Sequence, residues 1–160
     1  MQNLVTVILA AGAGTRMKSN TAKVLHKICG QAMLEYVIDA ARNAGSDEII
    51  AVIGHQADQV KESVKDVTFV LQNEQLGTGH AVMQARPVLE GRNGTVLVLY
   101  GDTPLITAQT LKRAYEAHLR ERNQVTVITA RVDDPTGYGR IIRDGSGKIR
   151  AIVEHRDATE

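Results

Sequence analysis

Short apolar, β-branched runs alternate with helical patterns along most of this chain of 160 residues. The runs consist largely of Val, Ile and Leu, as in strands that are buried on both faces of a sheet. Alternation of such strands with helices indicates βαβ units, and hence a doubly wound, mostly parallel α/β sheet. The predicted strands are Leu4–Leu9, Glu48–Gly54, Val67–Leu71, Thr95–Tyr100 and Val125–Ala130, and the predicted helices are Ala32–Gly45, Ala57–Lys65, Gly77–Arg86 (ending before Pro87) and Thr107–Arg122.

A different pattern begins near Asp133. The stretch DDPTGYGR is rich in turn residues, and IIRDGSGKIRAIVEH predicts a β-hairpin in which Asp-Gly-Ser-Gly forms the turn. Glu160 follows soon after the second strand of this hairpin, with no closing helix or strand behind it. We therefore expect residues 1–160 to form the N-terminal part of one α/β domain with an added hairpin, cut short at its C-terminus.

Charge and composition disfavour several classes of protein. Lys plus Arg number 19 against 18 for Asp plus Glu, and no basic tract occurs, so nucleic acid and anionic membranes are not expected partners. The N-terminal MQNLVTVILAAG has no basic leader and only a short apolar stretch, which favours a first strand over a signal peptide or a membrane span. The single cysteine, Cys29, suits a reducing cytoplasm and is expected to be a small buried apolar residue. The histidines are scattered without metal-ligand spacing and are expected to be surface residues or hydrogen-bonded core residues: His26, His55, His80, His118 and His155.

The first apolar run ends in LAAGAGTRM, a bend of small residues that would let a ligand approach the backbone. Backbone N–H groups in such a bend can hold phosphate oxygens at the carboxyl edge of a parallel sheet. A Walker A loop would need Gly-Lys-Ser/Thr after its glycines, and a dinucleotide fingerprint would need a third glycine where Met17 stands. The glycines alone fit a plain strand-to-helix turn equally well. The pattern Gly-x-Gly-Thr-Arg with Arg16 and the later Lys23 favours an anion site.

LAAGAGTRM followed by Lys23 resembles the signature loop of the sugar-phosphate nucleotidylyltransferases. Further stretches resemble the N-terminal uridylyltransferase domain of the bacterial bifunctional enzymes that make UDP-N-acetylglucosamine. These stretches are VLQNEQLGTGHA (70–81), LYGDTPLI (99–106), DDPTGYGRII (133–142) and IVEHRDAT (152–159).

The resemblance implies a Rossmann-like nucleotidyltransferase fold and transfer of uridylyl from UTP to N-acetylglucosamine 1-phosphate, with pyrophosphate as the leaving group and Mg²⁺ as the cofactor. It also implies a cytoplasmic enzyme of cell-envelope precursor synthesis (peptidoglycan and lipopolysaccharide). The acetyltransferase β-helix of those enzymes, and the homotrimer contacts that it makes, would lie outside this chain.

The same resemblance implies a role for each candidate site residue. Arg16 would neutralise the leaving pyrophosphate, Lys23 the α-phosphate, and Asp102 would bind Mg²⁺. Ala22 stands where the family commonly has Pro, which leaves open how rigidly Lys23 is presented. Nucleotide contacts are implied for Leu9, Ala10, Ala11, Gly12, Gly14, Thr15, Gln72, Gly77, Thr78, Tyr100 and Gly101, with Gln72, Gly77 and Thr78 at the uracil; sugar contacts are implied for Gly139 and Glu154.

Other functions stay open at this point. One is a uridylyl- or thymidylyltransferase that acts on another sugar 1-phosphate, such as glucose 1-phosphate. Another is a module that binds UTP or a UDP-sugar without turnover, because the family's second metal ligand and a sugar-contacting asparagine are expected beyond Glu160. An oxidoreductase is the weakest alternative, since the dinucleotide fingerprint is incomplete.

Overall fold

The computed structural model describes residues 3–14 and 17–158. Contacts divide the chain into two compact units, Met1–Gln124 and Val125–Glu160. No helix in the described stretches is long and apolar enough to cross a membrane. The first unit contains β1 (Leu4–Ala10), η2 (Lys23–Leu25), β2 (Lys27–Ile28), β3 (Gln31–Ala32), α1 (Met33–Asn43), β4 (Glu48–Ile53), α2 (Ala57–Ser63), β5 (Thr68–Leu71), α3 (Thr78–Gln84), α4 (Arg86–Leu89), β6 (Thr95–Tyr100) and α5 (Ala108–Arg120). The second unit contains β7 (Arg140–Arg143), β8 (Ile149–Val153) and η3 (His155–Asp157).

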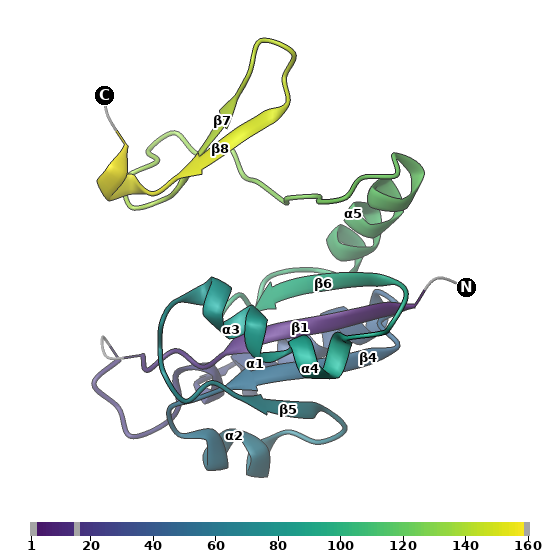
Figure 1. Cartoon of the computed structure of the whole chain (residues 1–160). Coiled ribbons are helices and arrows are strands. Elements are labelled where there is room, and N and C mark those ends of the chain that lie inside the picture. The colour runs from purple at the N-terminus through teal and green to yellow at the C-terminus, as the bar shows by residue number, and fades with distance from the viewer. Residues whose placement is uncertain (1–2, 15–16, 159–160) are drawn as a thin grey trace. The chain divides into compact units, whose positions relative to one another are not determined.

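A parallel sheet in the order β5-β4-β1-β6 forms the centre of the first unit (Figure 1). The strand order reverses at β1, because the chain runs from β1 to β4 on one side and later places β6 on the other. Parallel α/β sheets bind ligands at such a reversal. β6 forms one edge of this sheet, with Val96, Val98 and Tyr100 exposed along it. The mostly parallel α/β sheet predicted from the sequence is confirmed.

Helices cover both faces of the sheet, so β1 and β4 are buried on both sides. Ile8 and Ala51 belong to an apolar cluster with α1, α2 and α5, whereas Val7 and Val52 belong to a cluster with α3 and the turn that follows it. Figure 1 shows α3 and α4 on one side of the sheet and α1 on the other. Successive residues of one strand therefore enter different cores, which explains why the strands are continuous apolar runs.

The helices begin and end at local sequence signals. α5 begins after Thr107, whose Oγ1 accepts a hydrogen bond of 3.2 Å from the N–H of Thr110. α1 ends shortly before Gly45, which has a φ of +96°. α3 ends at Gln84, before Pro87, as predicted. The short α4 then follows, because a proline in the first turn of a helix needs no N–H partner.

Two expectations from the sequence are wrong. Residues 125–130, predicted as a strand, have no regular secondary structure, and Val125 is 77% exposed. β-branched residues form a strand only where a neighbouring strand and a core are available, and this run pairs with neither β7 nor β8. Cys29, expected to be buried, is exposed. It lies with Gly30 in the turn between β2 and β3, where both residues have positive φ values.

The second unit contains the predicted antiparallel hairpin, formed by β7 and β8. Asp144 organises its turn: the N–H of Asp144 donates to the Lys148 carbonyl at 2.9 Å, and Oδ1 of Asp144 accepts from the N–H of Ser146 at 2.9 Å. An Asp side chain that bonds the backbone two residues later is typical of a tight turn. The hairpin brings residues on either side of it, before β7 and after β8, close together.

Candidate functional site

A pocket of about 280 Å³ opens at the carboxyl edge of the sheet in the first unit. Its wall combines the ends of β1 and β6 and the loop after β5 with η2 and the start of α3, so segments far apart in the sequence meet there. Most of the residues predicted to contact a nucleotide are part of this wall. The lining residues are Leu9, Ala10, Ala11, Gly12, Lys23, Val24, Gln72, Gln75, Gly77, Thr78, Ala81, Tyr100 and Asp102.

The two glycines of the first bend have different roles. No heavy atom lies within 4 Å of the place where a Cβ of Gly12 would stand, so Gly12 leaves room on the pocket wall. Gly14 has a φ of +59°, and a Cβ there would come to 2.7 Å from the Cβ of Lys23. Gly14 therefore permits the close approach of Lys23 to the bend and is not itself part of the wall. Thr15 and Arg16 lie outside the described residues.

Lys23 and Asp102 meet in the pocket as an ion pair. Nζ of Lys23 donates a hydrogen bond to Oδ2 of Asp102, and the two side chains are 32% and 34% exposed. Lys23 begins η2, and Asp102 follows the end of β6. The two groups for which the resemblance implies contact with the α-phosphate and with the metal ion are therefore within reach of a single ligand. A triphosphate carrying a cation could divide the pair, with Lys23 on phosphate oxygens and Asp102 on the cation.

The donor set in the pocket fits a divalent cation that arrives with phosphate. Asp102 is the one carboxylate among the described residues of the wall. The described part of the chain also holds no group of three or more His, Cys, Asp or Glu side chains that could bind a metal by themselves. Mg²⁺ is commonly held by one or two carboxylates, several waters and the phosphates of the substrate. Asp102 would then be the protein ligand of such an ion.

Ala22, which stands in the place of the family's usual proline, has a hydrogen bond that proline could not make. Its φ is −53°, within the range of proline. Its N–H, however, donates to Oε1 of Gln59 at 3.0 Å, and Nε2 of Gln59 donates to the Asn20 carbonyl at 3.0 Å. The residue before Lys23 is thus held by a hydrogen bond to the Gln59 side chain of α2, whereas the family pattern would hold it through the rigid ring of proline.

Two glutamines of the loop after β5 line the pocket. Gln72 is 4% exposed, and its Nε2 donates to the Gly77 carbonyl at 3.2 Å. Gln75 donates from Nε2 to the carbonyl of Ala11 at 2.9 Å and so connects this loop to the bend after β1. Sequence reasoning missed Gln75, although it stands three residues after Gln72 within the quoted VLQNEQLGTGHA. Val24 and Ala81 also belong to the wall and were not predicted.

Gly101 follows β6 beside the pocket and packs closely against β1 and α1. Its N–H donates to the Leu9 carbonyl at 2.9 Å, which extends the pairing of β1 with β6. A Cβ on Gly101 would come to 3.2 Å from the Leu9 carbonyl oxygen and 3.3 Å from Cδ1 of Leu34. The close packing of β6 on β1 and α1 therefore favours glycine here, and this packing sets the position of Asp102 on the next residue.

The two predicted sugar-contacting residues lie together in the second unit. Gly139 precedes β7 and Glu154 follows β8. A Cβ on Gly139 would stand 3.5 Å from Cγ2 of Ile152 and 4.0 Å from Oε2 of Glu154. The hairpin thus places an exposed carboxylate beside a position without a side chain, an arrangement that can accept hydrogen bonds from a hydroxylated ligand.

Comparison with known sequences gives matches that span nearly the whole chain. A family model described as a MobA-like NTP transferase domain matches residues 6–156. The bifunctional protein GlmU of Thermoanaerobacter pseudethanolicus is 55% identical over 161 residues, which covers 100% of this chain and 35% of that protein. The chain therefore spans about a third of the length of this relative. The resemblance drawn from the sequence motifs is confirmed.

Solved structures share the fold. HddC from Yersinia pseudotuberculosis superposes with a TM-score of 0.68 at 26% identity, over 96% of this chain and 69% of that one. A nucleotidyl transferase from Methanothermobacter thermautotroptrophicus gives a TM-score of 0.63 at 28% identity, over 71% of this chain and 57% of that one. The predicted nucleotidyltransferase fold is thereby confirmed.

Proposed function

Because the chain belongs to the family of MobA-like NTP transferase domains, we propose that it transfers uridylyl from UTP to N-acetylglucosamine 1-phosphate. The single observation that carries this proposal is the pocket at the reversal of strand order, where Lys23 and Asp102 meet beside the ends of β1 and β6. We place the reaction in the cytoplasm, in the synthesis of cell-envelope precursors.

In the proposed reaction an oxygen of the sugar phosphate attacks the α-phosphorus of UTP. The bond from that phosphorus to the oxygen that bridges to the β-phosphorus breaks, and pyrophosphate leaves. No side-chain nucleophile is needed, since the sugar phosphate is already ionised at neutral pH. The protein must hold two anions in line and neutralise their charge. Lys23 would bind the α-phosphate, and Arg16 would bind the leaving pyrophosphate.

Mg²⁺ is the proposed metal. When bound to the phosphates it would neutralise developing negative charge on them. The chain would contribute the carboxylate of Asp102, which lies in the short turn after β6 and lines the pocket. Gly139 and Glu154 are the proposed sugar contacts: the glycine would leave room for the ring, and the carboxylate would accept hydrogen bonds from its hydroxyls.

The test is release of pyrophosphate from UTP and N-acetylglucosamine 1-phosphate, with and without Mg²⁺. Lys23→Ala should lower turnover by about 10²–10³-fold, as loss of a charge-stabilising group does. Lys27→Ala is the matched control, because Lys27 is exposed on β2 and does not line the pocket. Near-normal turnover by Lys23→Ala would contradict the role assigned to this residue.

The same assay separates the alternatives. Faster turnover with glucose 1-phosphate would change the proposed acceptor while leaving the reaction type in place. Calorimetric binding of UTP without pyrophosphate release under any of these conditions would replace the transferase by a nucleotide-binding module.

A further inference from the structure

Gln72 is a buried polar side chain on the wall of the pocket. It follows β5 directly, and its N–H donates to the Ile53 carbonyl at 2.7 Å, which holds its backbone to β4. The residue is 4% exposed. Among the described residues, Gln72 and Thr6 are the only polar residues that are buried. A buried amide needs hydrogen bonds at both its nitrogen and its oxygen, so its orientation decides what it offers to a ligand.

Two neighbours determine which way this amide faces. Nε2 of Gln72 lies 3.2 Å from the Gly77 carbonyl oxygen and 3.0 Å from Nδ1 of His80. A carbonyl oxygen only accepts, so the nitrogen of the amide must face Gly77, and the reversed amide would set two oxygens against each other. The second hydrogen of Nε2 then points at His80, whose Nδ1 must accept it. Both hydrogens of the amide are thereby engaged.

The oxygen of Gln72 is left for a ligand. No residue of the described chain gives Oε1 of Gln72 a hydrogen bond. Within residues 3–14 and 17–158, the only fully buried side-chain nitrogen or oxygen without a hydrogen-bond partner is Nε2 of His26. This atom departs from the expectation that each histidine lies at the surface or is hydrogen-bonded in the core. Oε1 of Gln72 is therefore accessible, and because Gln72 lines the pocket, this oxygen is an acceptor open to the pocket space.

The other side of the His80 ring is compatible with this arrangement. A neutral imidazole carries one hydrogen, so a ring that accepts at Nδ1 donates at Nε2. The amide of Gln84 lies 3.0 Å from that Nε2 and can turn its oxygen to accept from it. Turning Gln84 gives up the hydrogen bond of 3.2 Å from its Nε2 to the His80 carbonyl, just as turning Gln72 would give up the one to Gly77. The loss costs less at Gln84, because Gln84 is half-buried on α3 and water can replace the partner, whereas Gln72 is nearly inaccessible.

We propose that His80 is a positioning residue that fixes the Gln72 amide with its oxygen toward the pocket, and so makes the pocket select uracil over cytosine. His80 is not part of the pocket wall and acts through Gln72 alone. Uracil carries an N–H at ring position N3, and this N–H can donate a hydrogen bond to an amide oxygen. Cytosine carries a lone pair at N3, which repels the amide oxygen. The inference rests on the proposed use of UTP and adds the residue that sets the base preference.

The experiment compares UTP with CTP as the ratio of their kcat/KM values, with calorimetric affinities for both nucleotides as a second measurement. His80→Leu removes the acceptor at Nδ1 and frees the amide to turn. The ratio should then fall by about ten- to hundredfold, the usual effect of a mispaired buried hydrogen-bonding group. A merely structural defect would lower both values together and leave the ratio unchanged.

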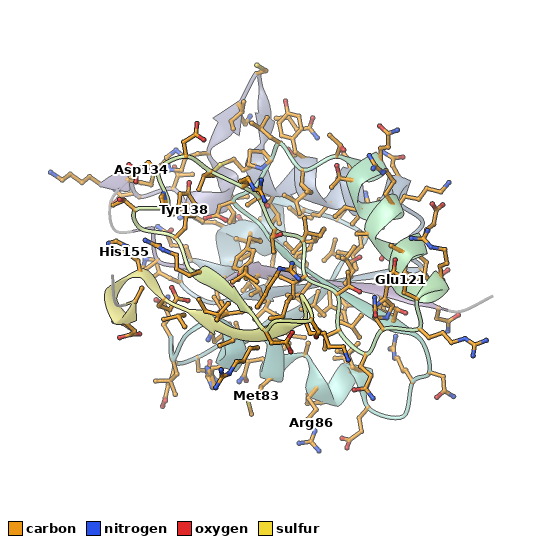
Figure 2. The ribbon with its side chains drawn as sticks, turned by 90° about the horizontal axis from the view of Figure 1, so that it is seen from above. Met83, Arg86, Glu121, Asp134, Tyr138 and His155 are labelled. Carbon is orange, nitrogen blue, oxygen red and sulfur yellow. The ribbon has the colours of Figure 1, made fainter. Side chains whose placement is uncertain are left out.

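Two further variants complete the test. His80→Asn places an acceptor oxygen near the position of Nδ1 and should keep the preference for UTP. Met83→Ala is the control on the same helix, because Met83 is 65% exposed and points away from the sheet (Figure 2). If the protein prefers UTP and His80→Leu keeps that preference, this inference fails while the proposed function stands. If the unaltered protein neither binds nor turns over UTP, both fail.

Discussion

Replacement of Gly14 by alanine tests how the first bend presents Lys23. At a φ of +59° any residue with a Cβ is in the left-handed region, which costs about 1–2 kcal/mol relative to glycine. The added Cβ would also stand 2.7 Å from the Cβ of Lys23, closer than such atoms approach in proteins. The backbone fixes the position of a Cβ, so relief of this contact requires the backbone of Lys23 or of the bend to move.

We therefore expect Gly14→Ala to lose stability and activity together. A loss of about 1–2 kcal/mol in the free energy of unfolding lowers the urea midpoint by about 0.5–1 M. Turnover in the pyrophosphate-release assay should fall as well, because Lys23 is displaced from Asp102 and from the proposed phosphate position.

Gly12→Ala is the matched control for this prediction. Gly12 lies in the same bend, its φ is not positive, and no heavy atom is within 4 Å of its added Cβ. The free energy of unfolding of this variant should stay within about 0.5 kcal/mol of the unaltered protein, although a methyl group on the pocket wall can still weaken nucleotide binding. Equal urea midpoints for the two variants would refute the reasoning about Gly14.

Three further perturbations test other parts of the first unit. A hydrogen bond from the Arg92 guanidinium lowers the pKa of Glu48 below its ordinary value of 4.5. The stabilisation from this pair is complete above that value and is lost as the pH falls through the lowered pKa. Urea titrations should therefore show a gap of up to about 1 kcal/mol between the protein and Glu48→Gln at pH 7, which closes at acidic pH; a gap independent of pH would contradict this. Leu111→Ala empties a fully buried site of α5 and should lower the free energy of unfolding by about 2–5 kcal/mol in thermal or urea denaturation. Ala22→Pro keeps the backbone angle but loses the bond to Gln59, so it should cost about 0.5–1.5 kcal/mol; in a double-mutant cycle the cost should shrink when Gln59→Ala is already present.

The central sheet could be predicted because each strand carries its own signal. β1 and β4 are buried on two faces, so their positions are apolar except for Thr6 and Glu48, and each run stands out from the helices around it. Residues 125–130 have the same composition, but a strand also needs a partner, and pairing is not a property of the run itself. Cys29 shows the same limit: its residue type favours burial, whereas the tight turn between β2 and β3 exposes it.

The candidate site could be predicted as a set of residues, but not as a set of contacts. The sequence motifs identify Lys23, Gln72 and Asp102 as candidate site residues, and all three line one pocket. The ion pair of Lys23 with Asp102 depends on how η2 approaches the end of β6, which no local pattern encodes. The bond from Gln75 to Ala11 depends likewise on two loops meeting across the sheet edge.

Within the described residues of the first unit, β6 pairs with β1 alone, and this edge has a consequence for how that unit behaves in solution. A strand with a neighbour on one side only presents a row of unpaired N–H and C=O groups, and here apolar Val96 and Val98 accompany them at 44% and 40% exposure. Such an edge is a template for any extended peptide, including the same strand of a second molecule. For the first unit we therefore expect self-association through β6 at high concentration, and a lysine introduced on this edge should reduce it.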